Sequence, residues 1–123
     1  MKLRISENSL RIRLSQTEVD MFAKEKSISE SIQFPGGLRL TYEILIDKVD
    51  QLECSYSQNK ITISIPRSLA DPWVKTDQVG FQREIDLDKA LKLSILIEKD
   101  FYRRSGKKDE NESDLYPNPL KSN

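Results

Sequence analysis

Three charged side chains stand where alternating strands should place apolar residues. They are Glu30, Arg83 and Lys99, and each has aliphatic or aromatic residues two positions before and after it. Burying a charge is costly unless it is paired. We therefore expect the three to form a polar pocket, in which the two cations bind a small anion and Glu30 orients them or takes a proton. Simpler interpretations are a slip of the alternation at a β-bulge and a position at the rim of a sheet, where long side chains reach water.

A second candidate is a basic surface patch on the first strands. Arg4, Arg11 and Arg13 share the polar side of the alternation with Lys2. Such a face is more often solvated, or paired with carboxylates of a neighbouring strand, than bound to phosphates. Aromatic residues for base stacking do not alternate with these cations, and basic and acidic residues balance at 20 each. We therefore do not expect a nucleic-acid partner.

The remaining residue types argue against several kinds of site. Histidine is absent, which removes the commonest general base and zinc ligand. The acidic run from Asp109 to Asp114 lacks the glycine and the closing glutamate of a calcium-binding loop. Cys54, the only cysteine, lies on the apolar side of its strand and is expected to be a buried, unreactive thiol. No catalytic motif stands out, so we favour a protein without catalysis, metal or cofactor.

Eight stretches of the chain alternate apolar and polar residues, as β-strands with one buried face do. They span about residues 2–5, 10–14, 28–34, 38–47, 52–56, 61–65, 79–87 and 91–101. Ser15 and Glu18 form a capping box, which predicts a helix over about 16–25. A second short helix is expected around residues 69–74, capped by Ser68 or Asp71 and with Pro72 in its first turn.

These elements predict a mostly β (α+β) domain over residues 1–101, an antiparallel barrel or sandwich of about eight short strands with two short helices. Eight is about the strand number at which a closed barrel holds one small ligand. The connections are mostly too short for crossovers, which argues against parallel pairing. No internal repeat is evident in the sequence.

The composition changes in residues 102–123, which we expect to form a charged C-terminal tail. A basic run over 103–108 precedes an acidic run over 109–114, and few apolar residues are present to offset the ordering entropy. Segment 115–120 is different, because Tyr116, Pro117, Asn118 and Pro119 make it extended and aromatic. We predict that this segment docks on the domain or on a partner, including the other subunit of a homodimer. A loosely ordered tail is the alternative.

Four segments resemble a known family. They are residues 9–19 (SLRIRLSQTEV), 76–80 (TDQVG), 96–101 (LIEKDF) and 116–119 (YPNP). Over nearly its whole length the chain resembles a family of small bacterial cytosolic proteins classed as a domain of unknown function. The resemblance implies bacterial origin and a cytosolic setting, and it implies that residues 98–101 and 116–119 are family features. It supplies no catalytic residues.

The expected function is a non-enzymatic binding or protein-interaction module, whose partner is a small anion or a protein. A single cysteine allows no intrachain disulfide, and no apolar run is long enough for a membrane span or signal peptide, so we expect the cytoplasm and no membrane. The alternative is a small enzyme or binder for a phosphorylated or carboxylated molecule, held by inward-facing charges in a β-barrel.

Overall fold

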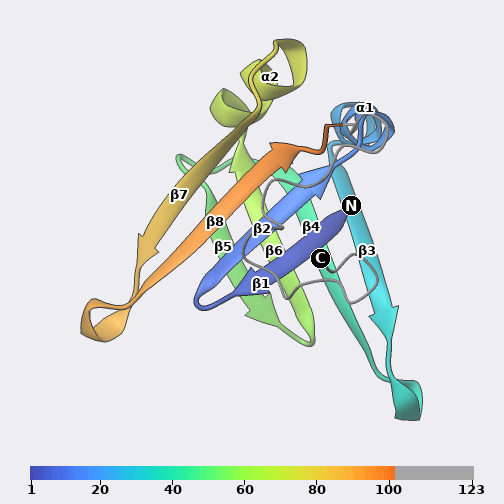
Figure 1. The fold of residues 1–123 in the computed structure, drawn as a ribbon, viewed down its shortest axis with the longest axis vertical. Helices are drawn as coiled ribbons and strands as arrows, with labels where there is room; N and C mark the ends of the chain where they lie inside the picture. Colours follow the sequence, from blue (N-terminus) through green and yellow to red (C-terminus); the bar gives the residue numbers. More distant parts are fainter. Residues whose placement is uncertain (102–123) are drawn as a thin grey trace, which may run out of the picture.

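The computed structural model describes residues 1–101, which form two four-stranded sheets and two helices (Figure 1). Sheet A contains, in spatial order, β1 (Lys2–Ser6), β2 (Ser9–Leu14), β8 (Lys92–Lys99) and β7 (Gly80–Asp86). Sheet B contains, in spatial order, β3 (Ser27–Gln33), β4 (Arg39–Asp47), β6 (Lys60–Pro66) and β5 (Glu53–Ser57). The helices are α1 (Gln16–Glu25) and α2 (Arg67–Lys75), and the short 3-10 turns are η1 (Pro35–Gly37) and η2 (Asp88–Ala90).

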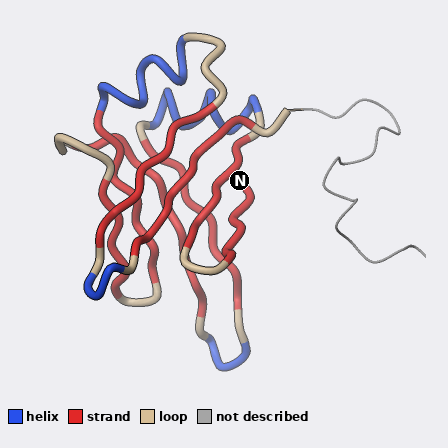
Figure 2. Tube along the Cα trace, turned by 60° about the vertical axis from the view of Figure 1, so that its left-hand side comes forward, coloured by secondary structure: helices blue, strands red, loops and turns tan. Residues whose placement is uncertain are grey.

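The prediction of a mostly β domain with eight strands and two helices is confirmed. The sheets do not close into a barrel, so the structure agrees with the sandwich of the two predicted architectures. Both helices lie at one end of the sandwich, and the hairpin turns lie at the other (Figures 1 and 2). We call these the helical end and the hairpin end. No helix within the described residues is long and apolar enough to cross a membrane.

Two strand pairs are parallel, contrary to the expectation from the short connections. β2 runs parallel to β8, and β4 runs parallel to β6, whereas the other four pairs are antiparallel. Neither parallel pair needs a direct crossover. All of sheet B lies between β2 and β8 along the chain, and a linker with the edge strand β5 lies between β4 and β6. Short loops therefore suffice, because the chain reaches each parallel partner through other strands.

The chain consists of two structural repeats. The order hairpin, helix, hairpin occurs as β1-β2-α1-β3-β4 and again as β5-β6-α2-β7-β8. Each half gives its first hairpin to one sheet and its second hairpin to the other. The turns match as well: Glu7 and Gln58, in the first turn of each half, have φ angles of 53° and 52°. The molecule is therefore built from two interlocked halves, which the sequence alone did not reveal.

The core lies between the sheets and is closed by the two helices. Phe22 of α1 and Trp73 of α2 are fully buried and meet edge to face, with ring centroids 6.1 Å apart. Trp73 also stacks edge to face on Phe81 at 5.4 Å, and its indole N–H donates to the Val79 carbonyl at 2.9 Å. These contacts bury the aromatic rings and satisfy the one polar atom they bring. The helices are thus fixed to both sheets at the helical end.

The helix starts differ in how well the sequence predicted them. The capping box of α1 is confirmed, because the Ser15 hydroxyl accepts from the Glu18 N–H and the Glu18 carboxylate accepts from the Ser15 N–H. The expected caps of α2 were wrong, since Pro66 is the N-cap and the helix begins at Arg67. Pro66 both ends β6 and leads directly into α2, which leaves no room for a separate capping residue. Pro72 consequently lies inside the helix rather than in its first turn.

Candidate functional site

Glu30 and Arg83 occupy corresponding positions, each at the centre of a seven-residue edge strand, β3 or β7. The Glu30 carboxylate accepts a hydrogen bond from the Met1 α-amino group at 2.8 Å. The Arg83 guanidinium donates to the Leu52 carbonyl. Met1 and Leu52 each immediately precede the first strand of a half, and both pack in the core. The two inward-facing charges therefore hold the starts of the two halves in place.

The group around Met1 contains several charges that compensate one another. The α-amino group also pairs with the carboxylate of Glu18, and the Tyr42 hydroxyl donates to the Met1 carbonyl at 3.0 Å and to Glu30 at 3.3 Å. Burial disfavours the charged α-amino group, but the hydrogen bonds that it donates to both carboxylates outweigh the burial and raise its pKa. Burial, reinforced by the Glu30 charge, raises the pKa of Tyr42. The charges of this group therefore pair with one another.

Lys99 lies apart from the other two predicted residues. Its ammonium donates to the Thr76 carbonyl at 2.8 Å and lies 6.0 Å from the centre of the Trp73 ring. Arg83 faces Ile95, four residues before Lys99 on β8, which places the backbones of the two residues about 13 Å apart along the strand. Glu30 belongs to the other sheet. The three charges are therefore not brought together, and each has its own partner.

A groove of about 900 Å³ lies beside Lys99 at the helical end. Its apolar walls are Leu14, Val19, Val74 and Phe101, and its charged rim is Lys2, Asp20, Lys99 and Asp100. Phe101 is 61% exposed, and Lys2 pairs with Asp100 at 2.9 Å. The Lys99 ammonium has three N–H groups and gives one to Thr76. The groove can thus take an apolar group and offer hydrogen bonds to an anion beside it.

A second groove, of about 590 Å³, lies at the corresponding place in the other half. Ile46 lines the second groove at the position that Lys99 has in the first. The backbone N–H of each donates at 2.9 Å to the residue just before the neighbouring edge strand, Lys26 before β3 and Val79 before β7. One wall is the chain that follows β4, residues 48–50. The chain that follows β8 in the first groove is described only as far as Phe101.

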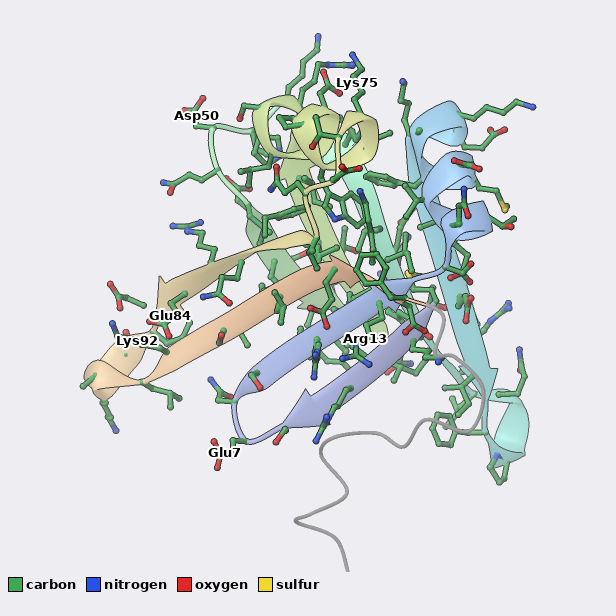
Figure 3. The ribbon with its side chains drawn as sticks, turned by 45° about the horizontal axis from the view of Figure 1, so that its top comes forward. Glu7, Arg13, Asp50, Lys75, Glu84 and Lys92 are labelled. Carbon is green, nitrogen blue, oxygen red and sulfur yellow. The ribbon has the colours of Figure 1, made fainter. Side chains whose placement is uncertain are left out.

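Arg11 and Arg13 of the predicted basic patch share one carboxylate on the outer face of sheet A. Arg11 Nη2 lies 2.6 Å and Arg13 Nε 2.8 Å from the same oxygen of Glu98. Burial disfavours the charged carboxylate, but the hydrogen bonds from Arg13 and Arg11 outweigh it and lower the pKa of Glu98. Arg4 has no ion-pair partner within residues 1–101. Figure 3 shows Arg13 on this outer face.

Glu98 and the groove are the features that sequence reasoning missed. Glu98 alternates to the polar side of its strand, so its pairing with the arginines depends on β2 lying next to β8. Gly80 faces Glu98 across the β7–β8 pair, where a Cβ would lie 2.4 Å from the Ile97 carbonyl oxygen. The signal available was the family-like segments 76–80 and 96–101, which meet here. Segment 9–19 joins them through β2 and the start of α1.

The remaining predicted features are simpler. Cys54 is half-buried, and burial raises the pKa of its thiol. Within residues 1–101 no cluster of three or more metal-ligating side chains is found. The predicted docking residues Tyr116, Pro117, Asn118 and Pro119 lie outside the described residues.

The fold and the groove define a class of β-sandwich in which two interlocked hairpin–helix–hairpin halves place a groove at the helical end. Comparison with family models gives the particular family: residues 1–120 match the family of unknown function DUF7009, and the chain belongs to it. The matched range includes the segment 116–119. No curated protein and no solved structure matches the chain.

Proposed function

We propose that this protein is a non-enzymatic binding module that holds its ligand in the groove beside Lys99. The ligand carries an aromatic or aliphatic group next to a carboxylate. The observation that supports this is the Lys99 ammonium at the rim of apolar walls, which among residues 1–101 gives one of its three N–H groups to the Thr76 carbonyl. The groove volume of about 900 Å³ falls in the range of ligand sites, about 300–1,000 Å³. We propose a cytoplasmic location, in keeping with the single cysteine.

The contacts of the other charges do not favour the alternative, a small enzyme or anion binder in a barrel. That function needs Glu30, Arg83 and Lys99 around one ligand. Glu30 pairs with Met1, and Arg83 binds the Leu52 carbonyl. Their charge or hydrogen-bonding capacity is thus used to fix the chain.

The test uses anilinonaphthalenesulfonate, a fluorescent dye with aromatic rings beside an anionic group. We expect saturable binding to the full chain that weakens about tenfold in Phe101→Ser, because about 1.4 kcal/mol of apolar contact is lost. Lys99→Met should weaken binding several-fold, because the anionic group loses its counter-charge. The measurement is a fluorescence titration, with far-ultraviolet circular dichroism to check that each variant is folded.

Two matched controls accompany these variants. Phe34→Ser removes a similarly exposed ring (48% exposed) at the turn of the β3–β4 hairpin, away from the groove. Lys75→Met removes an exposed ammonium from the last turn of α2, at the same end of the molecule (Figure 3). Equal effects of Phe101→Ser and Phe34→Ser, or no saturable binding, would contradict the proposal.

A further inference from the structure

We infer that the groove beside Lys99 is occupied by a segment of this same chain, Asp114–Leu120, which binds back in cis. The inference rests on the proposed function, since it assigns an occupant to the same groove. An outside ligand would then have to compete with this segment for the groove. Four independent features of the molecule support the assignment.

The first is the correspondence between the two halves. In the second groove the chain that leaves β4 forms a wall, with Lys48, Val49 and Asp50 on its way to β5. The chain that leaves β8 starts at the same place in the first groove, with Asp100 and Phe101 as lining residues. In both halves the chain that leaves the last strand therefore lines a groove, and the first groove is the larger one and has the exposed Phe101 in its wall.

The second is the chemistry of the segment. Leu115 and Tyr116 supply apolar side chains of the size that the groove walls accept, and the Asp114 carboxylate precedes them directly. This is the combination that apolar walls beside the Lys99 ammonium would bind. Pro117 and Pro119 fix φ at their positions, which lowers the conformational entropy lost when the segment is held in an extended form.

The third is reach. Leu115 follows Phe101 by 14 residues (115 − 101 = 14), a stretch that spans up to about 46 Å when extended. The chain enters this stretch at Phe101, which itself lines the groove. A return within the same chain therefore needs no rearrangement of the sandwich. A tether of this length gives an effective concentration on the order of millimolar, so contacts with a dissociation constant below that value would keep the segment bound.

The fourth is the extent of the family. The family match reaches residue 120, the end of the proposed segment. The proposed segment therefore lies within the range that defines the family.

The test is disulfide formation in the full chain. We would replace Cys54 by Ser and introduce the pair Val74→Cys and Asn118→Cys, because Val74 lines the first groove and Asn118 lies in the segment without being one of its proposed apolar anchors. The control pair is Ser68→Cys and Asn118→Cys, because Ser68 lines the second groove. Under a glutathione redox buffer, the first pair should form an intramolecular disulfide at least tenfold faster than the control, since docking holds the two thiols at bonding distance.

Three results would overturn the inference: equal rates for the two pairs, no intramolecular disulfide, or disulfides mainly between two chains on non-reducing gels. The last would assign the groove to the segment of a second copy. Dye binding separates this failure from failure of the proposed function. Full-length Leu115→Ser/Tyr116→Ser should bind anilinonaphthalenesulfonate several-fold more tightly than the unchanged chain. Unchanged affinity contradicts cis closure alone, whereas absence of groove binding in both proteins contradicts the proposed function.

Discussion

At the scale of single residues, two charged side chains on the apolar side of their strands bind the backbone at the start of each half. Glu30 and Arg83 have opposite charges at corresponding positions because their partners are opposite in character. Glu30 receives N–H groups from the Met1 ammonium, and Arg83 gives an N–H to the Leu52 carbonyl. Lys99 also donates to a backbone carbonyl, but it differs from both because it lies at the rim of a groove. The same sequence signal thus marks two structural contacts and one candidate binding residue.

Glu98 gives a prediction for pH dependence at this scale. Its pKa is lowered in the folded state because Arg13 and Arg11 outweigh the burial of its carboxylate. A lowered folded pKa contributes stability that is present above the ordinary glutamate value of about 4.5 and is lost as pH falls through the folded pKa. Glu98→Gln should therefore lower the free energy of unfolding by about 1–3 kcal/mol at neutral pH. The difference from the unchanged protein should shrink below about pH 4.5.

Urea unfolding at a series of pH values measures this difference. Glu84→Gln is the control, because that carboxylate is 59% exposed and lies 3.8 Å from the Lys92 ammonium. Figure 3 shows both side chains on the β7–β8 hairpin. The interpretation fails if the Glu98→Gln difference is the same at acidic and neutral pH.

At the scale of elements, the two halves form corresponding left-handed hairpin turns from different residues. The turn between β3 and β4 uses Gly36 and Gly37, with φ angles of 83° and 76°. The corresponding turn between β7 and β8 uses Lys89 and Ala90, with φ angles of 60° and 61°. Left-handed backbone costs a non-glycine residue roughly 1–2 kcal/mol. The second turn is therefore strained where the first is relaxed.

Exchanging these residues should move stability in opposite directions. Ala90→Gly is expected to raise the free energy of unfolding by about 0.5–1 kcal/mol, since relief of strain exceeds the entropy that glycine loses on folding. Gly37→Ala should lower it by about 1 kcal/mol. A Cβ on Gly37 would have nothing within 4 Å, so the effect comes from the backbone alone. Thermal unfolding of both variants measures it, and shifts of the same sign would contradict the assignment.

How far the sequence predicted these elements depends on how local each one is. The capping box of Ser15 and Glu18 and the strand alternation are set by neighbours a few residues away, and the sequence predicted them correctly. The parallel pairs and the repeat depend on contacts between strands far apart in the chain. The groove could not be predicted from the sequence, because it forms only where β8 and the two helices meet.

At the scale of the whole molecule, the two halves cannot form separate sandwiches with this strand order. Each sheet takes one hairpin from the first half and one from the second, joined by the parallel pairs β2–β8 and β4–β6. In a single half, Ile12 of β2 and Ile44 of β4 would lose the strands beside them, Ile97 and Ile63. Both isoleucines are fully buried in the complete fold. The halves therefore depend on each other for their cores.

This dependence predicts that the chain can be divided and reassembled. The division falls between Asp50 and Gln51, in the linker between β4 and β5 (Asp50 is labelled in Figure 3). Neither half alone should show cooperative unfolding, and mixing them should restore it, because each parallel pair forms only when both are present. Trp73, fully buried at the helical end, reports assembly by its fluorescence, since the half 51–123 holds the only tryptophan. A division inside β4, between Ile44 and Leu45, is the control and should not reassemble, because it cuts the strand that pairs with both β3 and β6. Cooperative unfolding of 51–123 by itself, with the same Trp73 spectrum as the whole chain, would show instead that the second half folds without the first.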